Sequence, residues 1–135
     1  MSPGAEKRAL QITAGLACLV PLSMGVASVI IGPSILSGID DPPPRDLDSH
    51  FRYLSGIFLM VGIAFATCVP GIERKTARFR LLGAMIVLGG LARAVSVMEY
   101  GLPSDGHRFG LVMELGVVPL LMIWQSRVAR RFGSE

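Results

Sequence analysis

Two oppositely charged residues, Arg93 and Glu114, lie within otherwise apolar stretches of the chain. Arg93 is thirteen residues after Arg80, and Glu114 is thirteen residues before Arg127. At about 1.5 Å per helical residue, each charge lies about 20 Å from the basic end of its stretch. In neighbouring helices of opposite direction, the two charges therefore meet at the same depth. Because an ionisable group inside a membrane is costly unless it is paired, the sequence predicts an ion pair between them.

Small residues and prolines are expected at the level of this pair. Gly89 and Gly90 are one helical turn before the arginine, and without side chains they let a neighbouring helix or a water come close. Pro21 and Pro119 lie inside apolar stretches, and a proline within a helix leaves the carbonyl four residues earlier without its donor. Such carbonyls can accept hydrogen bonds from a guanidinium. We therefore expect a polar pocket around the pair.

The predicted pair has two interpretations. It is either a brace that keeps two helices in register, because a paired charge can specify register without doing chemistry, or a site for a ligand headgroup or a path for protons. The second interpretation includes a small proton-coupled transporter, with Glu114 as the proton-carrying carboxylate and Arg93 as its charge partner. Exchanging the two charges separates the interpretations, because an exchanged pair still braces the helices.

A second set of polar residues lies at the ends of the apolar stretches that are away from the basic residues Arg80 and Arg127. It comprises Asp48, His50, Arg52, Tyr53, Glu99, Tyr100 and His107. Asp48 or Ser49 can cap a helix, and Arg52 and the tyrosines can anchor at a membrane interface. Carboxylates and imidazoles are also metal ligands, but no helical His-x-x-x-His spacing is present. We therefore predict neither a metal site nor an acid–base catalytic pair here.

The composition excludes several classes of protein. The 135 residues are 51% hydrophobic before 16 glycines are counted, and only 17% are charged, whereas about a quarter is usual in soluble domains. This balance excludes intrinsic disorder, and two cysteines cannot form a disulfide framework. A net charge of +3 would suit a nucleic-acid binder, but the basic residues lie at the ends of the apolar stretches. The composition indicates an integral membrane protein.

Four stretches are long enough to cross a bilayer as helices, which takes roughly 20 residues. They cover approximately residues 9–31, 51–69, 79–98 and 109–124. The first follows Lys7 and Arg8 as a signal peptide would, but it is too long for one and is expected to be retained. We predict one all-α transmembrane domain, residues 1–135, that forms an antiparallel, up-down four-helix bundle.

The basic residues are divided unevenly between the two sides of this predicted bundle. Four spans place both termini and the turn at 70–78 on one side, which holds nine of the thirteen Lys and Arg residues. Seven of the ten acidic residues lie toward the other side. Short loops rich in Lys and Arg remain in the cytoplasm, so we predict cytoplasmic termini, insertion in a bacterial inner membrane and contact with anionic lipids.

Two further pairs of residues are interpreted as structural. Cys18 and Cys68 lie within spans without redox-pair spacing, and we expect them to pack as small apolar residues. Trp124 and Gln125 are expected to mark the cytoplasmic interface of the fourth span.

Several short motifs carry a family resemblance. They are Arg-Ala-Leu-Gln at 8–11, His-Phe-Arg-Tyr-Leu-Ser-Gly at 50–56, Leu-Gly-Gly-Leu-Ala-Arg at 88–93, and Glu114 followed by Pro-Leu-Leu-x-x-Trp-Gln-x-Arg-Val-Ala-Arg at 119–130. Over nearly its whole length the chain resembles an uncharacterised bacterial family of small four-helix integral membrane proteins, catalogued as a domain of unknown function. The resemblance implies that fold and carries no activity with it. In architecture the chain is loosely similar to DoxX-like four-helix proteins, some of which accompany quinone-linked oxidoreductases.

These features predict a non-enzymatic inner-membrane protein with a polar pocket open toward the periplasm, acting as an accessory subunit or as a binder of lipid or a small ligand. The candidate pocket residues are Arg93, Glu114, Gly89, Gly90, His50, Arg52, Tyr53, Glu99 and His107. The alternatives are the proton-coupled transporter described above and an accessory of a quinone-linked oxidoreductase. Expected partners are membrane lipids, a larger membrane complex or a second copy of the chain, with no nucleic acid, cofactor or metal.

Overall fold

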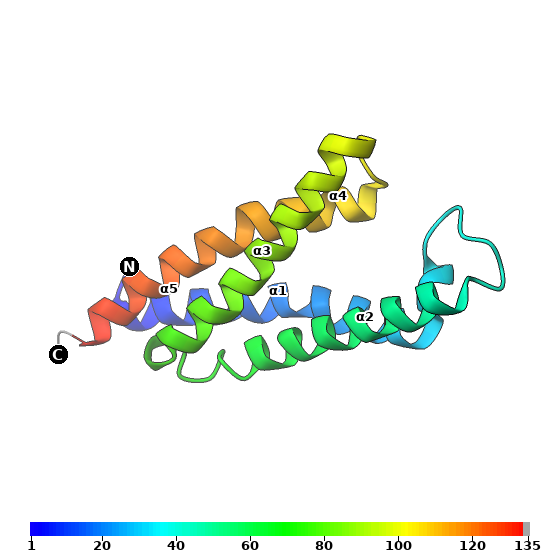
Figure 1. Ribbon diagram of the computed structural model, residues 1–135. Helices are drawn as coiled ribbons and strands as arrows, with labels where there is room; N and C mark the ends of the chain where they lie inside the picture. Colours follow the sequence, from blue (N-terminus) through cyan, green and yellow to red (C-terminus); the bar gives the residue numbers. More distant parts are fainter. Residues whose placement is uncertain (134–135) are drawn as a thin grey trace. The chain divides into compact units, whose positions relative to one another are not determined.

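A computed structural model describes residues 1–133, and in that range it contains helices and no strand (Figure 1). The five α-helices are α1 (Pro3–Ile31), α2 (Arg45–Ala66), α3 (Thr76–Tyr100), α4 (Asp105–Val112) and α5 (Val118–Gly133). Two 3-10 turns, η1 (Gly32–Ile35) and η2 (Ile72–Arg74), lie between the first three helices. A π-helical turn, η3 (Met113–Val117), joins α4 to α5 without a break. The all-α prediction is confirmed.

Four stretches of the described residues are long and apolar enough to cross a membrane, and they are Pro3–Ile35, Arg45–Ala66, Thr76–Tyr100 and Asp105–Gly133. They correspond to the four predicted spans, but their bounds differ. Helix α2 begins six residues before residue 51, directly after three consecutive prolines, and it ends at Ala66 instead of Val69. The fourth continues past Trp124 to Gly133. Helices extend beyond their apolar part because polar residues continue the same backbone hydrogen bonding.

The described residues form two compact units, and each is described by itself. Among the described residues, the first unit comprises 1–11 and 70–133, and so contains the start of α1, η2, α3, α4, η3 and α5. The second unit comprises Ile12–Val69, and so contains the rest of α1, η1 and α2.

In the second unit, two glycines bring α1 and α2 close together. A Cβ at Gly25 would lie 2.9 Å from the Cα of Leu59, and a Cβ at Gly62 would lie 2.9 Å from the Cβ of Pro21. Backbones can come this close only where a side chain is missing. Pro21 was expected to lie beside the polar pocket. In the second unit it packs against α2 at Gly62. Both cysteines are buried, although Cys68 lies beyond the end of α2 and not within it.

In the first unit, α3 packs along η3 and α5. Gln125 of α5 donates from Nε2 to the carbonyl of Ile72, at 2.8 Å, and to the hydroxyl of Thr76, at 2.9 Å. Farther along α3, a Cβ at Gly83 would meet the side chain of Met122. Gln125 is fully buried, and its side chain therefore joins α5 to η2 and to the start of α3. This register brings the later part of α3 to the level of η3.

Candidate functional site

Arg93 and Glu114 form a bidentate ion pair in the first unit. Arg93 donates from Nε to Oε2 and from Nη2 to Oε1 of Glu114, both at 2.9 Å. The arginine side chain is 32% exposed and the glutamate side chain is 12% exposed. Two parallel charge-assisted hydrogen bonds fix both the distance and the orientation of the two groups. The predicted contact between these residues is confirmed.

Gly90 makes room for this pair. A Cβ on Gly90 would lie 2.8 Å from the Cβ of Glu114 and 2.8 Å from the Cδ2 of Leu115, so any side chain there would push the two helices apart. Of the two glycines, Gly90 is therefore the one at which the neighbouring helix comes close to α3. Gly89 is exposed, and a Cβ there would meet nothing within 4 Å, so no neighbouring helix approaches closely at this position.

Glu114 lies on the π-helical turn η3. The N–H of Val118 donates to the carbonyl of Met113, five residues earlier, which is the hydrogen-bond spacing of a π-helix. Pro119 follows at once, and its ring would crowd the preceding turn of a regular α-helix. The wider turn accommodates the proline and carries the carboxylate toward α3. Single π-helical turns within α-helices are frequent at functional sites.

Gly110, which was not among the residues expected at the site, lies next to the pair. A Cβ on Gly110 would lie 3.7 Å from Nη2 of Arg93 and 3.8 Å from Oε1 of Glu114. Gly110 is four residues, or about one helical turn, before Glu114. That spacing was the signal that could have identified it. Because Gly110 has no side chain, nothing from this position covers the pair.

The guanidinium of Arg93 uses only part of its hydrogen-bonding capacity. Its Nε and Nη2 atoms bond Glu114, and among the described residues of the first unit Nη1 forms no hydrogen bond. Buried guanidinium donors are normally satisfied, and about a third of this side chain is exposed. The pair therefore presents an open edge of the arginine to its surroundings.

Alanine substitutions at the two neighbouring glycines are expected to have opposite effects. Gly90→Ala should destabilise the protein by about 1–3 kcal/mol, because its methyl group overlaps Glu114 and Leu115. Gly89→Ala should be neutral or stabilise by up to about 1 kcal/mol, because alanine is the better helix former and the position is open. Thermal unfolding of both variants in the same detergent tests this expectation. Equal midpoints for the two variants would contradict the close approach at Gly90.

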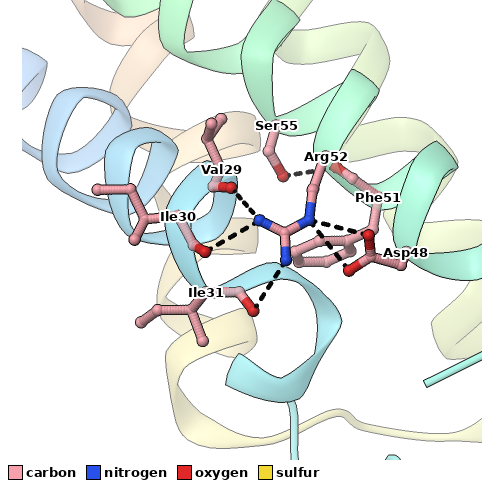
Figure 2. A network of polar contacts seen from close by, with 7 residues as sticks. All are labelled: Val29, Ile30, Ile31, Asp48, Phe51, Arg52 and Ser55. Carbon is pink, nitrogen blue, oxygen red and sulfur yellow. Dashed lines mark hydrogen bonds and ion pairs between the residues drawn. The ribbon is translucent and has the colours of Figure 1, made fainter. Parts of the chain in front are cut away.

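Arg52, predicted as an interface anchor and a candidate pocket residue, bonds the end of α1 and Asp48. In the second unit, its Nη1 donates to the carbonyls of Val29 and Ile30, and its Nη2 donates to the carbonyl of Ile31 at 3.5 Å (Figure 2). Its Nε donates to both carboxylate oxygens of Asp48, each at 3.0 Å. The last carbonyls of a helix lack intrahelical donors, so Arg52 caps the C-terminus of α1.

Gly32 is required for this cap. Its φ is +75°, in the left-handed region that favours glycine, and this conformation ends α1. A Cβ here would lie 2.6 Å from Nη2 of Arg52 and 2.7 Å from Oδ1 of Asp48. Asp48 is thus the partner of Arg52, and its predicted role as the cap of α2 is wrong. That helix begins after Pro44, with no side-chain cap at its start.

The other candidate pocket residues are His50, Tyr53, Glu99 and His107. Within the first unit, neither Glu99 nor His107 contacts the Arg93–Glu114 pair. In the second unit, His50 and Tyr53 are exposed near the start of α2. In the first unit, Glu99 is exposed near the end of α3, and Nδ1 of His107 lies 3.0 Å from the hydroxyl of Ser104. Among the residues that the structure describes, no three His, Cys, Asp or Glu side chains are grouped as metal ligands.

The first unit also contains a charge cluster that was not expected from the sequence. Glu6, near the start of α1, lies 3.3 Å from Nε of Arg127 and also binds Arg131, both near the end of α5. Nζ of Lys7 lies 3.0 Å from Oε1 of Glu73 in η2 and 5.3 Å from the centre of the Phe132 ring. The basic residues interpreted as topology signals therefore also hold three segments of this unit together.

Glu73 makes part of this cluster sensitive to pH. Burial works to raise the pKa of its carboxyl, but hydrogen bonds from its own backbone N–H, from Lys7 and from Arg74 outweigh burial and lower the pKa below its ordinary value. A carboxyl whose pKa is lowered by folding stabilises the protein above its unfolded pKa. That stabilisation is lost as the pH falls through the lowered pKa of the folded state.

We expect Glu73→Gln to cost about 1–2 kcal/mol near neutral pH, because Lys7 loses its carboxylate partner. The difference from the wild type should shrink in acid. Unfolding midpoints measured in detergent from neutral pH to about pH 3 test this. Asp105→Asn is the control, since the Asp105 side chain is 97% exposed and should contribute little. A constant difference between Glu73→Gln and the wild type over that range would contradict the prediction.

Comparisons with known proteins give one finding. No curated protein and no solved structure matches the chain. A family model described as "Domain of unknown function (DUF4345)" matches residues 9–125. This match includes α2, α3, α4 and the π-helical turn, and therefore both Arg93 and Glu114. Because the match covers most of the chain, the protein belongs to the DUF4345 family.

Proposed function

We propose that the chain is a non-enzymatic, multi-pass protein of a bacterial inner membrane whose Arg93–Glu114 pair is the centre of a binding site for a lipid or a small ligand. The observation that supports this is the open edge of Arg93, whose Nη1 has no acceptor among the described residues of the first unit. A charged donor at membrane depth is costly without a partner. A bound ligand with acceptor oxygens would supply that partner.

This proposal includes an antiparallel four-helix bundle with cytoplasmic termini and a pocket open toward the periplasm. The contacts Thr76–Gln125, Gly83–Met122 and Gly90–Glu114 support opposite directions for α3 and α5, because residue numbers rise along one helix as they fall along the other. A reporter that is active only after export should be inactive when it is fused to the C-terminus. Activity of that fusion would contradict this orientation.

The open edge favours a binding site over a brace that only keeps helices in register. A brace needs the two hydrogen bonds between Arg93 and Glu114 and nothing more. It gains nothing from exposed donors, nor from a glycine at position 110 that leaves the pair uncovered. A binding site uses both of these features.

Native mass spectrometry of the gently extracted protein tests the proposal. The wild type should retain a bound ligand, and Arg93→Leu should release it, because the acceptor atoms of the ligand lose their donor. Arg108→Leu is the matched control, since Arg108 pairs with Asp105 at the start of α4 and makes no contact with the site. A wild type without a ligand, or Arg93→Leu with the same ligand, would contradict the proposal.

A second candidate is a small proton-coupled transporter, and the π-helical turn is the observation that favours it. Glu114 lies on a turn whose hydrogen bonds differ from those of the flanking helices, so the carboxylate can move with a local change in helix geometry. In proteoliposomes, proton-dependent flux that is abolished by Glu114→Gln would support transport. Absence of flux with every candidate solute would count against it.

A further inference from the structure

We propose that Arg80 and Arg130 bind the phosphate group of an anionic phospholipid beside Ser126, where α3 and α5 pack together in the first unit. These three residues are called the Ser126 site below. The site is separate from the Arg93–Glu114 pair and does not depend on the ligand proposed there. It rests on the proposed function only for the insertion of the chain in a membrane.

The acidic side chains of the first unit divide the basic residues near Ser126 into two groups. Four basic residues bind a buried carboxylate, and they are Lys7 and Arg74 at Glu73, and Arg127 and Arg131 at Glu6. Arg80 and Arg130 are exposed, and neither forms an ion pair with a described residue of the first unit. Their charges are therefore available to a negatively charged partner, whereas an anion at the other four would compete with their own carboxylates.

Ser126 brings the two arginines together. Arg80 of α3 donates to the hydroxyl of Ser126 from Nη2 at 3.0 Å and from Nε at 3.4 Å. The same hydroxyl donates to the carbonyl of Met122 at 2.8 Å, so its oxygen is oriented to accept from Arg80. Arg130 follows Ser126 by four residues, which places it on the same side of α5, about one turn farther on. Two arginines from different helices therefore lie beside one hydroxyl.

A phosphodiester matches these two arginines. Nε and Nη2 of Arg80 bond Ser126, and Nη1 forms no hydrogen bond with a described residue of the first unit. Guanidinium groups bind phosphate through charge-assisted hydrogen bonds, and a phosphodiester has two charged oxygens, one for each arginine. Two positive charges without a carboxylate also favour a headgroup of net negative charge over a zwitterionic one, whose own ammonium group compensates the phosphate.

The surface next to the Ser126 site matches the acyl chains of a lipid. On the same side of α3 as Arg80, Ala84 is exposed one turn later and Leu91 is exposed three turns later. On α5, Ile123 is exposed about one turn before Ser126. A charged site that continues into exposed apolar side chains fits a molecule with a charged head and apolar chains. Basic pockets between membrane helices hold acidic lipid headgroups in this way.

The position of the Ser126 site along the helices agrees with the depth of a headgroup. Arg80 is four residues after Thr76, where α3 begins, and Arg130 is three residues before Gly133, where α5 ends. At about 1.5 Å per residue, both arginines lie about 4–6 Å from the ends of their helices. The headgroup region is about 5–8 Å thick on each side of a bilayer. A phosphate bound here therefore lies among the headgroups.

Native mass spectrometry of the full chain in an uncharged detergent tests the proposal by titration with phosphatidylglycerol, which is anionic, and with phosphatidylcholine, which is zwitterionic. The wild type should bind phosphatidylglycerol at least about tenfold more tightly. Arg80→Gln and Arg130→Gln should each weaken that binding at least about tenfold, because each removes a charge-assisted hydrogen bond to the phosphate. Arg80→Lys should lose less, since it keeps the charge without the planar donor group.

Arg78→Gln is the matched control. Arg78 is also exposed on α3, but it lies two residues before Arg80 and so faces another side of the helix. The variant loses the same charge and should weaken binding less than about threefold, because a charge away from the phosphate is screened. The substituted side chains are exposed, so all variants should unfold near the wild-type midpoint. If Arg80→Gln does not fold, Arg130→Gln and Arg80→Lys decide the result.

Three results would overturn the proposal. They are equal affinity for the two lipids, equal losses in Arg78→Gln and Arg80→Gln, and displacement of the lipid by an equal concentration of inorganic phosphate, which would make a soluble anion the occupant.

Arg93→Leu separates this inference from the proposed function. Phosphatidylglycerol that stays on Arg93→Leu and leaves Arg80→Gln occupies the Ser126 site. Phosphatidylglycerol that leaves Arg93→Leu and stays on Arg80→Gln would overturn this inference and leave the proposed function intact. A ligand that stays on both Arg93→Leu and Arg80→Gln would overturn both.

Discussion

Glu114→Leu is expected to destabilise the folded protein by about 2–3 kcal/mol. Removing one partner of a buried ion pair typically costs about 3–5 kcal/mol, because the other charge is left uncompensated. We place this variant below that range because the Arg93 side chain is 32% exposed and keeps some contact with its surroundings. Arginine does not lose its proton in proteins, so Arg93 cannot escape the cost by becoming neutral.

The reverse substitution and the double substitution complete a cycle. Arg93→Leu should also destabilise the protein, since it leaves the carboxylate of Glu114 without its charge partner. The double variant with leucine at both positions should recover most of the loss, because no unpaired charge remains. Unfolding free energies in mixed micelles measure all three. Asp105→Leu is the control, and removing this exposed partner of Arg108 should cost less than about 1 kcal/mol. Additive losses in the double variant would contradict the pairing.

Arg52→Met should cost about 2–3 kcal/mol, the second largest effect that we expect. Methionine keeps much of the length of the side chain but removes the donors from the last three carbonyls of α1 and leaves Asp48 unpaired. Each unsatisfied polar group costs about 1–3 kcal/mol when fully buried and less when partly exposed, as here.

A matched control for this prediction lies on the same helix. Arg45 is exposed at the start of α2, and Arg45→Met should change stability by less than about 0.5 kcal/mol. Hydrogen exchange gives a local measure, because loss of the cap should speed exchange of the Leu36 N–H, which bonds the carbonyl of Pro33 in η1. Equal stability and equal exchange in the two variants would show that Arg52 does not cap α1.

The helices were largely predictable from the sequence, but their ends were not. Long, largely apolar stretches identify four helices because a membrane span needs little besides length and hydrophobicity. The first turns of α2 and the last turns of α5 are rich in charged and polar residues, so hydropathy gave no signal there. The prolines before Arg45 could have located the start of α2, since proline favours the positions next to the first turn of a helix.

The ion pair of the candidate site was predictable from the depth of its two residues along their helices. Equal spacing from Arg80 and Arg127 placed Arg93 and Glu114 at one level, and the contact followed. Depth alone could not show which of Gly89 and Gly90 contacts the neighbouring helix, because both lie about one turn before Arg93. The answer depends on which side of α3 that helix packs against. The bond from Glu6 to Arg131, 125 residues away, has no local signal at all.

Exchange of the two charges tests most directly whether Arg93 and Glu114 form a binding centre. The double variant Arg93→Glu with Glu114→Arg keeps an ion pair, so it should fold with a free energy of unfolding within about 1 kcal/mol of the wild type. It moves the guanidinium, and with it the open edge, from α3 to the π-helical turn. Native mass spectrometry should then find the wild type with its ligand and the folded double variant without it. The same ligand on both proteins, in the same amount, would show that the pair only braces the helices.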